Sequence, residues 1–205
     1  MAKEDQVIAV VPRGILEENL FNRFQDANIY NFEKDILNNL IYKKRGLVDP
    51  NGDFQGDSNF KQPIGYGVLV NPWNKEVYAY QRTSDENSDP NLQGKWSWGI
   101  GGHIEKSLDL GNPIVTSLER ELSEEVSLNG KITNVQAIGY VNDDSNEVGK
   151  LHLGILYILE TNSIYAEPKG DEVAQGKFIK LRNLIDLVNV ETWSQIALAP
   201  LERRY

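Results

Sequence analysis

Three glutamates with little positive charge around them are the residues of this sequence best suited to chemistry. Glu121, Glu124 and Glu125 are spaced i, i+3 and i+4, so on a helix their carboxylates share one face. Like charges this close repel each other, and the adjacent basic residue is Arg120. The pattern predicts a cation supplied from outside, and ligands that are all oxygen favour Mg²⁺ or Mn²⁺ over zinc. A solvated acidic helix face is the alternative.

The segment that carries these glutamates is expected to be an amphipathic helix. Asn112 is a favourable N-cap, and Pro113 suits the first helical position, where its missing N–H costs nothing. Apolar residues then recur every four positions, at 114, 118, 122 and 126. This spacing predicts one buried stripe beside the acidic face.

A stretch rich in tryptophan and glycine precedes the helix. Trp96 and Trp98 alternate with small residues, so one face of a strand is aromatic. Core packing is the first interpretation of this face, and stacking on a substrate base is the second. Glycines at 99, 101 and 102 let the backbone turn tightly and approach a ligand. His103 is interpreted as a positioned loop residue and not as a metal ligand, so Trp98 and His103 are candidates for substrate contact.

The combination Gly-Gly-His-Ile-Glu followed by Arg-Glu-Leu-Ser-Glu-Glu resembles the signature of the Nudix (MutT-like) hydrolases, G-x5-E-x7-R-E-U-x-E-E-x-G-U, in which U is aliphatic. Gly102 serves as the opening glycine, and the later matches are Arg120, Glu121, Leu122, Glu124, Glu125 and Leu128. The resemblance covers residues 64 to 180. It implies an α+β Nudix fold, a mixed β-sheet sandwich flanked by helices (α/β/α), here with an N-terminal strand-plus-helix extension.

The signature departs from the family pattern in three places. Four extra residues separate Gly102 from Arg120, Asn112 stands where the pattern has Glu, and Ser127 stands where it has Gly. In the family, the missing glutamate partners the arginine. Either Glu105 or Asp109 is expected to take over that partnership, and the sequence does not decide between them.

The resemblance implies roles for the acidic residues and for the glycine turn. Glu121 would bind metal and orient or deprotonate water, while Glu124 and Glu125 would bind metal directly. Arg120 would fix Glu121 through a charge-assisted hydrogen bond. A backbone carbonyl of the glycine pair joins the metal shell in the family, and Gly101 could supply it.

Two further site residues are implied outside the signature. The family often places an arginine near substrate phosphates at the end of a hairpin strand, and Arg82 is the candidate, with a surface arginine as the alternative. A late loop often brings one more glutamate to the metals or to the attacking water. Glu172 is best placed for that role, Asp171 and Glu167 come next, and a solvated acidic loop is the alternative.

The implied activity is Mg²⁺-dependent (or Mn²⁺-dependent) hydrolysis of a diphosphate linkage in a nucleotide-type small molecule, a nucleoside diphosphate joined to a moiety X. Such cleavage depends mainly on positioning and charge neutralisation.

One alternative is a Nudix-fold nucleotide-binding or regulatory module without turnover, suggested by Asn112 and Ser127. Another is an isopentenyl diphosphate isomerase-like protein, suggested by Trp-Ser-Trp-Gly-Ile-Gly-Gly-His. Those isomerases typically use a catalytic cysteine, and this sequence has none.

Composition narrows the class and the compartment. The 205 residues are 40% hydrophobic and 25% charged, as expected of a soluble globular protein. The net charge of −9 argues against nucleic-acid binding. No apolar run is long enough for a membrane span, and the N-terminus does not resemble a signal peptide. The absence of cysteine excludes disulfides and thiolate zinc sites. A cytoplasmic protein is expected, and family habit suggests a homodimer.

Residues 1–60 are expected to be an N-terminal extension packed on the core, shaping the pocket or a dimer interface. Residues 61–205 are expected to be the Nudix hydrolase domain.

His152, within an apolar strand, is expected to be a core residue whose hydrogen bonds are satisfied, with a substrate role as the alternative. The patterns predict strands at 6–12, 64–70, 76–82, 132–141 and 149–159, helices at 15–25, 31–45, 181–188 and 191–204, and loops at 46–62, 84–93 and 167–176.

Overall fold

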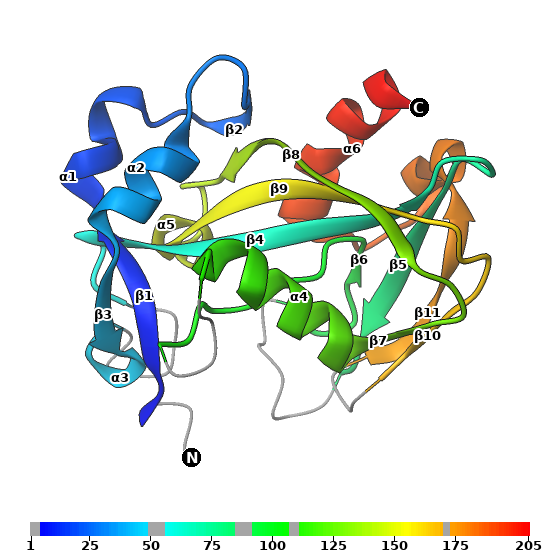
Figure 1. Ribbon diagram of the computed structural model, residues 1–205, viewed down its shortest axis with the longest axis horizontal. Helices are drawn as coiled ribbons and strands as arrows, with labels where there is room; N and C mark the ends of the chain where they lie inside the picture. The colour runs from blue at the N-terminus through cyan, green and yellow to red at the C-terminus, as the bar shows by residue number, and fades with distance from the viewer. Residues whose placement is uncertain (1–4, 49–55, 85–91, 107–110, 170–172) are drawn as a thin grey trace. The chain divides into compact units, whose positions relative to one another are not determined.

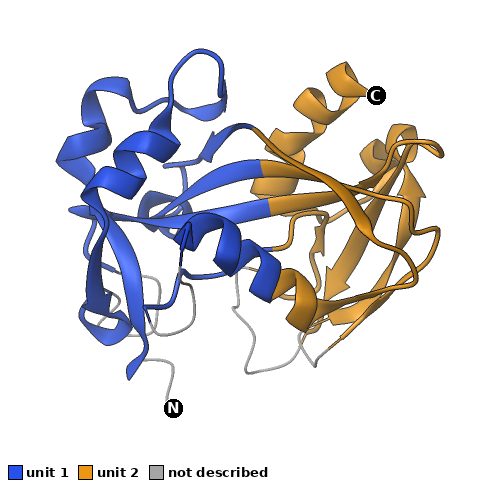
Figure 2. Cartoon of the chain, in the orientation of Figure 1, with its two compact units in different colours: residues 1–66, 101–120, 138–156 blue, residues 67–100, 121–137, 157–205 orange. Residues whose placement is uncertain are grey.

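The structure is a computed structural model that describes residues 5–48, 56–84, 92–106, 111–169 and 173–205. These residues belong to two compact units that interleave along the chain (Figure 2). Unit 1 comprises residues 1–66, 101–120 and 138–156, and unit 2 comprises residues 67–100, 121–137 and 157–205. The predicted domain boundary after residue 60 falls within the first segment of unit 1 and stays a prediction.

The chain has helices and strands in the α+β mixture that the sequence predicts. Hydrogen-bonded strands follow the order β11-β5-β4-β9-β8-β2, with β1 joined to β3 and β4, and β6 joined to β5 (Figure 1). The elements are β1 (Val7–Pro12), α1 (Arg13–Leu16), the 3-10 helix η2 (Glu17–Asn19), β2 (Arg23–Asp26), α2 (Phe32–Asn39), β3 (Ile41–Lys44), α3 (Arg45–Val48), β4 (Phe60–Asn71), β5 (Glu76–Arg82), β6 (Trp96–Ser97), α4 (Pro113–Glu125), β7 (Val126–Leu128), β8 (Ile132–Asn142), α5 (Glu147–Leu151), β9 (His152–Thr161), β10 (Ala166–Pro168), β11 (Val173–Lys180), the 3-10 helix η3 (Leu181–Asp186) and α6 (Thr192–Arg204).

The N-terminal strand is confirmed, but the helix predicted at 31–45 is too long. Helix α2 ends at Asn39, and the chain continues into β3, which pairs antiparallel with β1. Strand β1 is deeply buried, with Ile8 and Val10 fully enclosed, so its backbone groups need partners that water cannot supply. Residues 41–44 supply those partners. Their pairing with β1 outweighs the helix that their sequence pattern predicts.

Two other predicted elements also change type. The helix expected at 15–25 ends by Asn19, because residues 23–26 form β2 on the edge of β8. The strand expected at 149–159 begins at His152, because residues 147–151 form helix α5. The side chain of Asn146 caps α5 by accepting a 2.8 Å hydrogen bond from the Gly149 N–H.

Helix α4 forms as predicted. Asn112 Oδ1 accepts hydrogen bonds from the N–H groups of Ile114 at 3.1 Å and Val115 at 3.4 Å, as an N-cap does. Ile114 and Leu118 are buried in unit 1. The fourth member of the apolar stripe, Val126, is buried in strand β7 and not in the helix.

Two glycines of unit 1 allow α4, β4 and the glycine-rich loop to approach closely. A Cβ atom on Gly65 would lie 2.8 Å from the carbonyl oxygen of Ile114 in α4. A Cβ atom on Gly101 would overlap the carbonyl oxygen of Gly65. Gly101 is therefore needed for packing, whatever its carbonyl does.

The C-terminal part of unit 2 differs from the predictions in two places. The loop predicted at 167–176 is wrong at both ends, because residues 166–168 form β10, which pairs with β7, and β11 begins at Val173 and pairs with β5. Residues 181–186 form a 3-10 helix in place of the predicted α-helix, and α6 spans Thr192–Arg204 with Pro200 inside it. Among the described residues, none of the helices combines the length and apolar character needed to cross a membrane.

The substitution Gly101→Ala is expected to lower the free energy of unfolding by about 1–3 kcal/mol, because the new methyl group meets backbone that cannot move aside cheaply. Urea unfolding measures this. Gly14→Ala is the matched control, since a Cβ atom at Gly14 meets nothing within 4 Å. Equal stability of the two variants would contradict the packing role of Gly101.

Candidate active site

The three glutamates of the signature occupy the last part of helix α4. The helix is continuous from Pro113 to Glu125, so Glu121, Glu124 and Glu125 keep their common face. Glu124 is exposed and the other two are half-buried. The C-terminal end of a helix carries partial negative charge, and the last turn of α4 contains no basic residue. Both features favour a cation at this end of α4.

The chemistry of these donors fits a hard divalent ion. Three carboxylates on one helix face supply the oxygen ligands that Mg²⁺ and Mn²⁺ prefer. Within the described part of the chain, no three His, Cys, Asp or Glu side chains are already gathered closely enough to hold a metal ion. Gly101, the predicted source of a backbone ligand, belongs to unit 1, and the three glutamates belong to unit 2.

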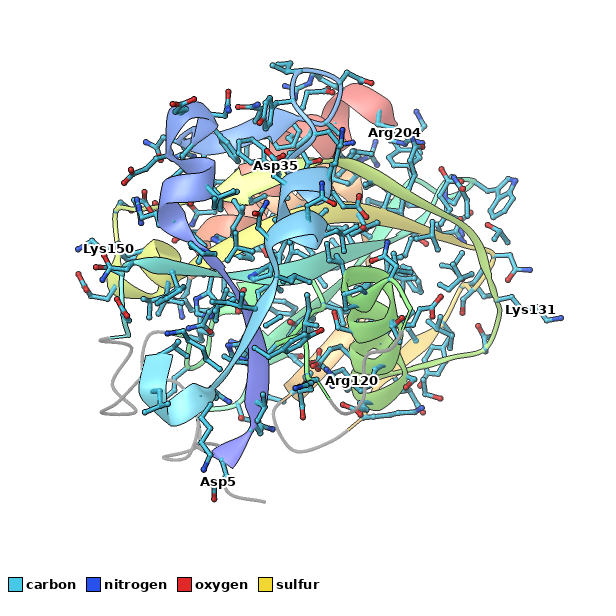
Figure 3. All side chains as sticks on the ribbon, turned by 60° about the vertical axis from the view of Figure 1, so that its left-hand side comes forward. Asp5, Asp35, Arg120, Lys131, Lys150 and Arg204 are labelled. Carbon is cyan, nitrogen blue, oxygen red and sulfur yellow. The ribbon has the colours of Figure 1, made fainter. Side chains whose placement is uncertain are left out.

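Arg120 connects helix α4 to the glycine-rich loop within unit 1. Its Nη2 donates a 2.9 Å hydrogen bond to the carbonyl oxygen of His103 (Figure 3 labels Arg120). Of the two acidic partners that the sequence proposed for it, Glu105 accepts a 3.5 Å hydrogen bond from Gln6 Nε2, and Asp109 lies outside the described residues. The signature arginine therefore positions loop backbone. Its predicted link to Glu121 stays a prediction.

The N-terminal strand holds the same loop by backbone hydrogen bonds. The N–H of Ala9 donates to the carbonyl of Ile104 at 2.9 Å, and the N–H of Lys106 donates to the carbonyl of Val7 at 3.0 Å. On the other side, His103 forms a bridge to Ile64 of β4. Strand β1 thus forms part of the framework of the loop.

The ring of His103 lies in a hydrogen-bonded chain with His152. Nε2 of His103 is 2.7 Å from Gln62 Oε1 and 3.3 Å from Nε2 of His152, while Nδ1 of His152 is 2.7 Å from the carbonyl oxygen of Val148. A carbonyl oxygen only accepts, so Nδ1 of His152 carries its proton and its Nε2 is an acceptor. The one proton on Nε2 of His103 points to Gln62 Oε1, an amide oxygen that also only accepts, and is shared at the longer distance with Nε2 of His152. Burial lowers the pKa of His152 to about 4, and the charges of Lys61 and Arg45 act in the same direction. His152 is therefore neutral and satisfied.

A buried lysine, Lys61, organises the turn before His152. Its Nζ donates to Asn142 Oδ1 at 2.8 Å, to Asp144 Oδ1 at 2.6 Å and to the carbonyls of Gly149 at 2.8 Å and His152 at 3.2 Å. Burial lowers the pKa of Lys61 to about 8, although Asp144 acts against this shift. Sequence reasoning missed this residue, and a charged side chain at the start of an apolar strand was the available signal.

Arg82, the predicted phosphate contact, pairs with a carboxylate near the C-terminus. Its Nε donates to Glu191, and its Nη2 donates to the Tyr80 hydroxyl at 3.3 Å. Burial disfavours the charge of Arg82, but Tyr80 and the carboxylates of Glu191 and Glu125 raise its pKa overall. The Arg82 side chain is 21% exposed. It is therefore a fixed guanidinium and not a freely moving surface arginine, and its contact with phosphate stays a prediction.

The remaining predicted site residues are one tryptophan and three acidic residues of the late loop. Trp98 is buried in unit 2, as core packing predicts. Its indole N–H and the hydroxyl of Tyr78 have no hydrogen-bond partner among the described residues. Glu172 and Asp171 lie outside the described residues. Glu167 lies in β10 and accepts a hydrogen bond from the Tyr165 hydroxyl.

Comparison with known proteins assigns the chain to a family. No family model matches the sequence. Protein YmaB of Bacillus subtilis (strain 168) is 32% identical over 211 residues, which cover 98% of this chain and 100% of YmaB. The chain belongs to the YmaB family. Agreement over the whole length means that the N-terminal segment is shared with that family.

Solved structures confirm the Nudix fold. Tm1382, a candidate Nudix hydrolase, matches with a TM-score of 0.72 at 24% identity, over 98% of this chain and 100% of that one. The Nudix domain of Shewanella oneidensis NrtR, complexed with ADP ribose, matches with a TM-score of 0.54 at 17% identity, over 71% of this chain and 89% of that one. The match to Tm1382 takes in the N-terminal segment as well.

The buried neutral state of His152 predicts a pH-dependent stability. Its pKa falls from 6.5 to about 4 on folding, so the unfolded chain binds more protons between these values. The stabilising contribution is therefore complete above pH 6.5 and is lost as pH falls to about 4, by up to about 3 kcal/mol. Urea unfolding across this range compares the natural chain with His152→Asn, whose amide can still donate to Val148. Parallel pH curves for the two proteins would refute this assignment.

Proposed function

We propose that this protein is a hydrolase that uses Mg²⁺ or Mn²⁺ to cleave a diphosphate linkage in a nucleoside diphosphate joined to a moiety X. The observation that carries the proposal is the continuous helix α4, which presents Glu121, Glu124 and Glu125 on one face without a basic residue in its last turn. The Nudix fold and the loop held by Arg120 support it.

In this proposal, different residues bind the metal, activate the water and position the glycine-rich loop. Glu124 and Glu125 hold the metal, and Glu121 both ligates it and orients or deprotonates the attacking water. A bound divalent ion neutralises phosphate charge and lowers the pKa of water. Arg120, in the second half of α4, fixes the carbonyl of His103 and so ties the Gly101–His103 turn to that helix. Gly101 offers a backbone carbonyl as a further oxygen ligand.

Substrate recognition falls to other groups in the proposal. Arg82 is a guanidinium already held in one orientation by Glu191, so it loses little conformational freedom on meeting a phosphate. The buried indole N–H of Trp98 has no acceptor among the described residues, and a substrate oxygen could supply one. His103 and Glu172 complete the proposed set, His103 as a substrate contact and Glu172 as a further catalytic glutamate.

A substrate panel tests the proposed function. Nucleoside triphosphates, ADP-ribose, dinucleoside polyphosphates, NADH and sugar nucleotides are incubated with the protein, with and without Mg²⁺ or Mn²⁺, and released phosphate and nucleotide are measured. Turnover of one class that depends on the metal is expected, and that class identifies X. ADP-ribose belongs in the panel because the NrtR Nudix domain was solved in complex with it.

The substitution Glu124→Gln is expected to abolish turnover, by at least about a hundredfold, while the melting temperature stays the same. Glu124 is exposed, so its loss affects metal binding and not packing. Glu119→Gln is the matched control, because Glu119 is an exposed glutamate of the same helix that does not belong to the acidic cluster. Full activity of Glu124→Gln would refute the assignment.

A nucleotide-binding module without turnover is the second candidate. Asn112 favours it, because this residue replaces the family glutamate and serves as the N-cap of α4. Binding of a panel nucleotide, measured by calorimetry, with no product formed in either metal would support this candidate over the hydrolase.

A further inference from the structure

The side-chain amide of Gln62 is buried beside His103, but only its oxygen has a partner. Gln62 lies near the start of β4, and the residue is 4% exposed. Its Oε1 is 2.7 Å from Nε2 of His103, and its Nε2 has no hydrogen-bond partner among the described residues. An amide nitrogen carries two donors, and a buried donor without an acceptor costs free energy. The unpaired nitrogen therefore favours an acceptor that a ligand supplies.

The direction of the Gln62 amide follows from one backbone carbonyl. The carbonyl oxygen of Val148 accepts from Nδ1 of neutral His152 at 2.7 Å, so Nε2 of His152 has no proton of its own. This nitrogen lies 3.3 Å from Nε2 of His103. Two ring nitrogens that both lack a proton repel each other at this distance, so Nε2 of His103 carries one. The Gln62 atom that faces it must then be the amide oxygen, because the amide nitrogen only donates.

The backbone on both sides of Gln62 is also fixed. Lys61 is fully buried and donates to four acceptors. Pro63 restricts the residue before it to extended conformations, and Ile64 forms a bridge with His103. The Gln62 side chain thus starts from a well-fixed strand and is held at its oxygen, so its nitrogen keeps one direction. A donor held in this way loses little conformational freedom when a ligand binds.

His103 connects Gln62 to the proposed site. The ring of His103 is a proposed substrate contact, and its backbone carbonyl accepts a 2.9 Å hydrogen bond from Nη2 of Arg120 in the signature helix. Gln62, His103 and Arg120 all belong to unit 1. The unpaired nitrogen of Gln62 is therefore one hydrogen bond away from a group that is proposed to meet the substrate.

We propose that Gln62 is a substrate-binding residue: its amide nitrogen donates a hydrogen bond to an oxygen atom of the substrate, while its amide oxygen orients the ring of His103. The inference rests on the proposed function, because it takes His103 as a substrate contact. An amide nitrogen donates and does not accept. The site therefore selects an acceptor, such as a phosphate or carbonyl oxygen, and disfavours a donor such as an amine at the same place.

Two variants of Gln62 test the contact with substrate in the full chain. Gln62→Met has a similar shape and no hydrogen-bonding amide, and Gln62→Glu keeps an acceptor for His103 but has no N–H donor. Both are expected to raise KM for the panel compound that is cleaved roughly tenfold, while kcat stays within about threefold. Added negative charge alone predicts a loss in Gln62→Glu only. Support of the His103 ring alone predicts a loss in Gln62→Met only.

Gln25→Met and Gln25→Glu are the matched controls. Gln25 is a half-buried glutamine of β2 in the same unit, and KM is expected to stay within about twofold in both of its variants. If Gln62→Met does not fold, Gln62→Glu carries the test, with Gln25→Glu as the reference for the same change in charge. For a panel nucleotide that binds without being cleaved, the dissociation constant from calorimetry replaces KM.

Binding of inorganic diphosphate with Mg²⁺ identifies the oxygen that Gln62 contacts. Weaker binding to Gln62→Met than to the natural chain assigns the contact to a phosphate oxygen. Unchanged diphosphate binding together with a raised KM for the whole compound assigns it to the nucleoside or to X.

The direction of the amide is tested without substrate by ¹⁵N NMR of the histidine rings. The chain contains two histidines, so the variant His152→Asn identifies both sets of signals. The proton is expected on Nε2 of His103 and on Nδ1 of His152. An Nε2 without a proton on His103 would mean that the Gln62 nitrogen faces the ring, and the inference would be overturned.

The outcomes separate this inference from the proposed function. Unchanged KM in both Gln62 variants overturns the role of Gln62 and leaves the hydrolase intact, because the three glutamates of the signature are unaltered. Absence of both turnover and nucleotide binding in the natural chain overturns the proposed function, and the role of Gln62 falls with it.

Discussion

The hydrogen bond from Arg120 to the carbonyl of His103 links the two halves of the signature. The arginine lies on α4 and its acceptor lies in the glycine-rich loop. A charged donor makes this bond stronger than an ordinary backbone hydrogen bond. The same loop is held by β1 through Ala9 and Lys106, and it packs against β4 because Gly65 and Gly101 lack side chains. The end of the glycine-rich loop is therefore tied to helix α4 through Arg120.

Buried charges set most of the remaining constraints. Lys61 and Glu191 are both enclosed, and each has a partner of opposite charge, Asp144 and Arg82 respectively. Removing one member of such a pair leaves an uncompensated charge, which costs more than the pair contributes when intact. One pair ties β4 to the turn that follows β8 in unit 1, and the other ties β5 to the residue that precedes α6 in unit 2. The protein thus uses ion pairs to position these segments of backbone, and hydrophobic burial to stabilise its strands.

Two histidines of unit 1 are also held in place by specific hydrogen bonds. His152 is held in one tautomer by the carbonyl of Val148, and this leaves its Nε2 as an acceptor for His103. Gln62 and His152 both contact the same ring nitrogen of His103, Nε2, and together they orient the ring. His103 is thus a positioned loop residue, as its place after two glycines indicated.

Local features of this protein were determined by the sequence alone. The N-cap at Asn112, the register of Glu121, Glu124 and Glu125, the β4–β5 hairpin and the Nudix fold all follow from spacing over a few residues or from the signature, because neighbours along the chain supply the interactions. Residues 41–44 form a strand, and Lys61, His152 and Glu191 find partners between 49 and 109 positions away. Only the tertiary structure decided this strand and these pairings. A buried donor or charge must be paired with a group that the fold brings close to it, and the periodicity of the local sequence does not indicate which group that is.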